Sequence, residues 1–224
     1  MGRVTWWAVL SSACAPVVLI GGSMTATLLE EPSYNPVHQT ISVLAATGPT
    51  GYWALTSTLI LLGVCHLTTA FGLRAAAPAG RLALGAGGLC AMLLALFPAP
   101  LTGGSFSHGS VVTVGFSLLA VWPVLACGRG VRASRRARSG RRPDAGTGRG
   151  PGAAYAPRWA DTPWALRPVP SYTVSALIGA GAAWFLVALE LHSAPGIAER
   201  VLTTVQSLWP VIVVGSCLLH ARRA

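Results

Sequence analysis

The sequence predicts an all-α polytopic membrane protein: a bundle of about six transmembrane helices with a short interfacial helix after the first. Three observations predict it. Of the 224 residues, 53% are hydrophobic and only 10% are charged, whereas soluble domains carry about 25% charged residues. The apolar residues are gathered in runs that approach or exceed the ~20 residues needed to cross the hydrocarbon of a bilayer. The arginines lie almost wholly between or beside these runs.

Six apolar runs meet the length requirement or come close to it. The third is the shortest, at about sixteen residues, and Pro98 and Pro100 stop it. Such runs are too long for the strands of a membrane barrel, so helices are the expected form. The predicted spans are 4–29, 52–73, 82–97, 109–127, 172–191 and 201–219.

A short helix on the outer surface is predicted over 35–46. Asn35 ahead of Pro36 is a helix-start signal. Apolar residues then recur at intervals of four and three, which is typical of one helix face. Gly48 and Pro49 close the segment.

Three parts of the chain follow from this pattern: a four-helix half over 1–127, a loop over 128–170 and a two-helix hairpin over 171–224. The loop is rich in Arg, Gly and Pro, and we expect its central part to be disordered. Its 128–150 stretch is expected to contact anionic lipid headgroups. Binding of nucleic acid or a protein partner is the alternative, but basic residues beside apolar runs are topology signals, so no nucleic-acid partner is expected.

The arginines also predict the orientation. With a cytoplasmic N-terminus, every arginine except Arg200 falls on the cytoplasmic side of the membrane, as the positive-inside rule requires. Four of the six acidic residues then fall on the outer face. We therefore expect a multi-pass protein of the cell membrane with both termini in the cytoplasm.

Small residues within the predicted helices indicate where helices pack closely. Gly85, Gly87 and Gly88 lie in the third span, and Gly179 and Gly181 in the fifth; such residues allow close backbone approach in lipid.

The five cysteines all lie in apolar segments and form no CxxC pair. We interpret them as packing residues rather than as disulfides or metal ligands.

Polar residues gather at the predicted outer face. His38 and Ser42 are four apart on the predicted short helix, His108 opens the fourth span, and Glu190 and His192 close the fifth. Two chemistries are open to them: the three histidines and a carboxylate could bind a divalent metal, or His38 could activate Ser42 as a nucleophile. No HExxH or GxSxG motif supports either. The simplest interpretation is polar residues at helix ends, with no cofactor and no committed catalytic residue.

Two ionisable residues lie within predicted spans and suggest a further possibility. Glu190 falls in the last turn of the fifth span, and His66 lies deeper, in the second. Intramembrane ionisable groups commonly mark transport or proton pathways, although His66 could simply hydrogen-bond to a neighbouring helix.

Three functional hypotheses result. The first is a non-enzymatic envelope or partner-binding component, favoured because no catalytic set is complete. The second is an outer-leaflet lipid hydrolase or transferase that uses the His, Ser and Glu residues above. The third is a small transporter.

The run from Tyr34 to Leu44 resembles the segment after the first helix in a membrane family known as domain of unknown function nine-nine-eight. Its pattern there is roughly Tyr-x-Pro-x-x-x-x-Ile-Ser-x-Leu. The Phe97-Pro98 pair and His108 also resemble this family. The family often has acidic residues after the Phe-Pro pair and beside the Ile-Ser pair, where this chain has Ala99-Pro100 and Val43. The resemblance therefore implies the six-helix topology and argues against a catalytic carboxylate at those two places.

Overall fold

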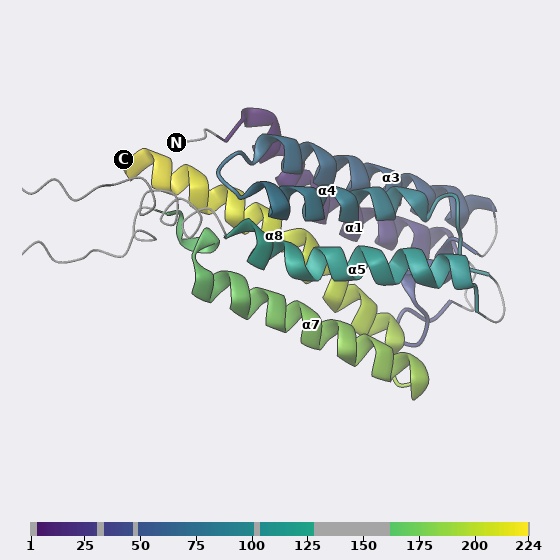
Figure 1. The fold of residues 1–224 in the computed structure, drawn as a ribbon. Helices are drawn as coiled ribbons and strands as arrows, with labels where there is room; N and C mark the ends of the chain where they lie inside the picture. Colours follow the sequence, from purple (N-terminus) through teal and green to yellow (C-terminus); the bar gives the residue numbers. More distant parts are fainter. Residues whose placement is uncertain (1–3, 31–33, 47–48, 101–103, 128–161, 224) are drawn as a thin grey trace, which may run out of the picture.

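The computed structural model describes residues 4–30, 34–46, 49–100, 104–127 and 162–223, and every regular element among them is a helix. The all-α bundle predicted from the sequence is confirmed (Figure 1). Its elements are α1 (Trp6–Leu29), α2 (Ile41–Leu44), α3 (Pro49–Gly72), α4 (Pro78–Leu93), α5 (Phe106–Ala126), the 3₁₀ turn η2 (Trp164–Leu166), α7 (Pro168–Glu190) and α8 (Pro195–Arg223).

The six long helices pack as a closed ring in chain order. α1 packs on α3, α3 on α4, α4 on α5, α5 on α7, α7 on α8, and α8 returns to α1. The start of α1 and the end of α8 lie at the same end of the bundle (Figure 1). The opposite end, which carries α2, is called the outer end below. Because α8 closes the ring, its side chains meet residues from both the first and the middle parts of the chain.

Among the described residues, five helices are long and apolar enough to cross a membrane: α1, α3, α5, α7 and α8. The predicted third span corresponds to α4, which has 16 residues and so a length of about 24 Å. It begins four residues before the predicted start because Pro78 can open a helix without losing a needed N–H. It ends before the predicted stop, and single turns follow it at 94–97.

The helix predicted over 35–46 is broken. The structure has a turn at 36–38 and a helix of only four residues, α2. A continuous helix would join the Ile41 N–H to the Val37 carbonyl. Here the Val37 carbonyl accepts from the Gly196 N–H at 3.1 Å, and the Ile41 N–H donates to the Glu199 carboxylate. The Val37 carbonyl and the Ile41 N–H therefore bond to the start of α8 instead of to each other, and the predicted helix is interrupted.

The second half of the chain also differs from the prediction at its boundaries. α7 begins at Pro168 and α8 at Pro195, where starts at 172 and 201 were expected. Residues 162–170, placed in the loop, include the turn η2, whose Leu166 is buried in the core. The rest of the predicted loop, 128–161, lies outside the described residues.

Close helix packing is found at two of the predicted glycines. A Cβ on Gly88 would lie 2.8 Å from the Gly63 carbonyl oxygen, and one on Gly87 would lie 2.7 Å from the Leu119 side chain. The Gly63 oxygen is a backbone atom, so α4 needs glycine at position 88 to approach α3, whereas at position 87 the Leu119 side chain would have to shift. At Gly179 nothing lies within 4 Å of the added Cβ, and the prediction of close packing there was wrong.

Candidate functional site

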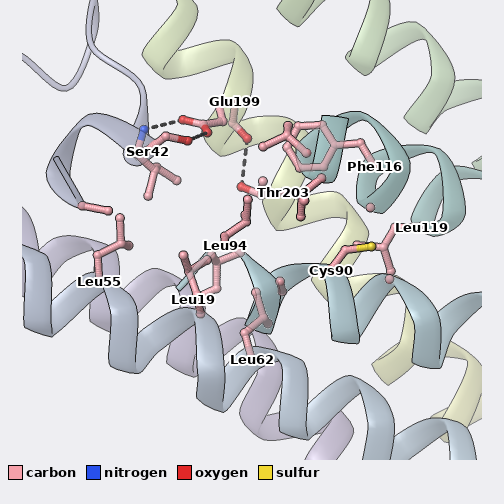
Figure 2. A pocket seen from close by; sticks show the side chains of 18 of the residues that line it. Leu19, Ser42, Leu55, Leu62, Cys90, Leu94, Phe116, Leu119, Glu199 and Thr203 are labelled. Carbon is pink, nitrogen blue, oxygen red and sulfur yellow. Dashed lines mark hydrogen bonds between the residues drawn. The ribbon is translucent and has the colours of Figure 1, made fainter. Parts of the chain in front are cut away.

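A cavity of about 80 Å³ lies within the ring of helices, lined by residues of α1, α2, α3, α4, α5 and α8. Most of its wall is apolar, and Figure 2 shows Leu19, Leu62 and Leu119 among the lining side chains. Polar residues also contribute to the wall: Ser42, His66, His108, Glu199, Thr203 and Gln206. It is called the central cavity below.

Glu199 is the most unusual residue of this wall, because its carboxylate is buried. Its exposed fraction is 5%. One carboxylate oxygen accepts from the backbone N–H of Ile41, and the other accepts from the Ser42 hydroxyl at 3.2 Å. The Thr203 hydroxyl, one turn further along α8, donates to the Glu199 carbonyl at 2.8 Å. Figure 2 shows Ser42, Glu199 and Thr203 together at one side of the cavity.

Arg200, the next residue, is directed to the outer segment, defined here as residues 34–46. Its guanidinium donates to the carbonyls of Pro36 (2.9 Å) and Gln39 (3.2 Å) and to the Tyr34 hydroxyl (2.6 Å). Burial raises the pKa of the Tyr34 phenol, so the hydroxyl keeps its hydrogen and can donate to the Thr40 carbonyl. Glu199 and Arg200 thus fasten the outer segment to α8 from two adjacent positions.

His66 forms a deeper polar part of the wall. It is 1% exposed, and its Nδ1 atom has no hydrogen-bond partner within the part of the chain that the structure describes. The close approach of α4 explains this burial, since the space above the Gly88 Cα is filled by the His66 Cβ. Gln206 is equally buried, and its amide donates to the Phe116 carbonyl at 3.3 Å, which leaves the amide oxygen as an acceptor.

His108 lies at the start of α5, where the Ser105 hydroxyl accepts from its backbone N–H at 3.3 Å. Its Nδ1 atom lies 2.8 Å from the Phe97 carbonyl oxygen. A carbonyl can only accept, so Nδ1 carries the hydrogen and Nε2 is the free position in the neutral ring. The Phe-Pro pair and the histidine singled out in the sequence are therefore in direct contact.

The structure separates the other predicted site residues from this cavity. His38, Glu190 and His192 are exposed. His38 lies in the turn before α2 and no longer shares a helix face with Ser42. His192 follows α7 with a φ of 53°, in the left-handed position that often ends a helix. Among the described residues, no three His, Cys, Asp or Glu side chains are grouped so that they could hold a metal ion.

Glu199, Thr203 and Gln206 were not singled out from the sequence. Glu199 was counted only as one of the outer acids, because the sixth span was expected to begin after it. The signal that could have found all three is their spacing. Positions 199, 203 and 206 follow intervals of four and three, so they lie on one face of a helix that begins at Pro195.

Residues 12–148, more than half of the chain, match a family described as protein of unknown function (DUF998). The chain belongs to this family. No curated protein and no solved structure matches it. The DUF998 match begins within α1 and covers α2 to α5, and so includes Ser42, His66 and His108. Glu199 comes from α8, outside the matched residues. In this DUF998 protein the cavity therefore combines polar groups from the matched part with a carboxylate from the part that follows.

Proposed function

We propose that this DUF998 protein is a non-enzymatic membrane protein that binds a small organic cation in the central cavity, with Glu199 as the anchoring group. The observation that carries the proposal is the buried carboxylate on an apolar cavity wall. An ionised carboxylate in such surroundings is costly unless it is paired and well hydrogen-bonded. Glu199 accepts from Ile41 and Ser42, while the adjacent guanidinium is directed to the outer segment. A bound ammonium group would supply the missing positive charge.

The size of the cavity limits the ligand. An engineered cavity of about 150 Å³ holds benzene, and a water molecule takes about 30 Å³ of liquid. About 80 Å³ therefore suits a cation of a few heavy atoms, such as ethylammonium. The hydroxyls of Ser42 and Thr203 and the amide oxygen of Gln206 can accept hydrogen bonds from it.

Replacing Glu199 with glutamine should weaken ethylammonium binding at least tenfold, or about 1.4 kcal/mol, because the charge is lost while the shape is kept. Binding can be measured in lipid nanodiscs as the rise in melting temperature with ethylammonium concentration. Glu190→Gln is the matched control, since Glu190 is an exposed glutamate outside the cavity, and it should bind like the wild type. Equal binding by Glu199→Gln and the wild type would contradict the proposal.

A second candidate is the outer-leaflet hydrolase or transferase, now favoured by one contact. The Ser42 hydroxyl donates to the Glu199 carboxylate at 3.2 Å, so the carboxylate could take the serine proton as the serine oxygen attacks an ester carbonyl. The ester bond would then break, the departing alcohol would take that proton, and water would hydrolyse the acyl-serine to free fatty acid. His108 lines the same cavity. We would then expect the protein to release fatty acid from phospholipid vesicles, Ser42→Ala to abolish the release and His108→Ala to reduce it. Absence of release by the wild-type protein would remove this candidate.

We also propose that the protein lies in the cell membrane with both termini in the cytoplasm. The start of α1 and the end of α8 lie together (Figure 1), and Arg222 and Arg223 close α8, as a cytoplasmic end favours. A fluorescent protein fused after Ala224 should therefore be bright, and an alkaline phosphatase fused there should be inactive. An active phosphatase would contradict this orientation.

A further inference from the structure

A second hollow lies beside the central cavity, on the outside of the ring. It is a groove of about 420 Å³ between α1 and α8, open to the surroundings of the bundle. On α1 its lining runs from Leu19 to Leu28, and on α8 it includes Arg200 and Thr204. The contributing positions of α1 recur at helical intervals, so one face of α1 forms the wall. It is called the outer groove below.

The outer groove and the central cavity are separated by a single layer of side chains. Leu19, Ile41 and Thr203 line both hollows. Leu19 and Ile41 are buried, and Thr203 is partly buried. All three therefore belong to the partition, and a ligand that occupies both hollows must displace these side chains.

On the side of the outer segment, access from water is less direct. At the outer end, the outer segment lies against α8 through the Gly196 N–H, the Glu199 carboxylate and the Arg200 guanidinium. A route past it must break several hydrogen bonds at once. On the groove side, by contrast, Met24 and Leu28 are 61% and 83% exposed, so a bilayer would place lipid directly beside the partition.

We infer that the ligand is a single-chain amphipath with an ammonium head, which reaches the site sideways from the outer leaflet. The head lies in the central cavity against Glu199, and the chain lies in the outer groove. This inference rests on the proposed function and names its ligand class. The central cavity alone is too small for such a molecule, whereas the groove falls within the 300–1,000 Å³ usual for ligand sites.

Charge places the head on the cavity side. Arg200 is one of the groove-lining residues and repels an ammonium group, while Glu199 lines only the central cavity and attracts it. Thr203 borders both hollows, and its hydroxyl oxygen can accept a hydrogen bond from the head as it passes. An anionic head would instead be attracted by Arg200 in the groove and repelled by Glu199 in the cavity.

The test uses the full chain in lipid nanodiscs and two probes, dodecylammonium and the water-soluble ethylammonium, with bound probe counted by native mass spectrometry. Thr204 lines the outer groove and not the central cavity, so Thr204→Trp is expected to fill the groove. It should weaken dodecylammonium binding at least tenfold and change ethylammonium binding less than twofold. Val205→Trp is the matched control, since Val205 is partly exposed on α8 and lines neither hollow, and it should bind both probes like the wild type.

The outcomes separate the two proposals. If the wild type binds no ethylammonium, the proposed function fails and the inference fails with it. If ethylammonium binds but Thr204→Trp leaves dodecylammonium binding unchanged, the groove assignment alone is overturned. If dodecanol binds as tightly as dodecylammonium, the assignment of an ammonium head is overturned.

Discussion

A Gly196→Ala variant is expected to lose about 3 kcal/mol of unfolding free energy, the upper part of the range for overpacking a close contact. A Cβ at this position would overlap the carbonyl oxygens of Pro36 and Gln39. These are backbone atoms and cannot rotate away, so the outer segment must move off α8. The bond from the Gly196 N–H to the Val37 carbonyl would be lost as well. Denaturant unfolding in detergent measures the change.

Gly215→Ala is the matched control for that variant. Gly215 lies on the same helix, and nothing lies within 4 Å of a Cβ added there. Alanine at this position should be neutral or stabilise the helix by up to about 1 kcal/mol. Equal losses in the two variants would mean that the contact between α8 and the outer segment does not contribute to stability.

The second large effect is expected for Glu199→Ala. The change removes the acceptor of the Ile41 N–H and of the Ser42 hydroxyl. Leaving a buried donor without a partner costs about 1–3 kcal/mol, so we expect a loss of about 2–6 kcal/mol for the two together. Glu199→Gln should cost much less, because its amide oxygen still accepts from the Ile41 N–H.

Amide hydrogen exchange gives a local measurement of the same contact. The Ile41 amide should exchange faster in Glu199→Ala than in the wild type or in Glu199→Gln. The control is an amide within α3, such as Leu62, whose exchange should follow only the global stability. Unchanged exchange at Ile41 in the alanine variant would contradict the assigned hydrogen bond.

The helical bundle could be predicted from the sequence because hydrocarbon imposes a simple rule: about twenty apolar residues and no charges within the span. The same rule misplaced the start of α8. Pro195 to Arg200 carry two charges and were assigned to a loop, yet they are helical. Both charges hydrogen-bond to the outer segment, a contact between residues more than 150 positions apart in the chain.

The site was predicted only in part, for the same reason. Ser42 and His108 were named from the sequence, and both line the central cavity. Glu190 was singled out because it falls in the last turn of the predicted fifth span, but it is exposed. Which of two glutamates is buried depends on what packs against it, and local hydropathy does not contain that information. The break between His38 and Ser42 likewise depends on α8, not on the segment itself.

The shortness of α4 has a consequence for the surrounding bilayer. A helix of 16 residues spans about 24 Å, some 6 Å less than the usual hydrocarbon thickness of about 30 Å. In a bilayer of that thickness, a spanning α4 would compress the lipid tails beside it or draw headgroups and water toward its end, at a cost of a fraction of a kcal/mol per Å. Since the turn that holds Phe97 against His108 follows α4, this hydrophobic mismatch favours hydration at that corner of the bundle. Thinner membranes should accommodate the protein with less distortion.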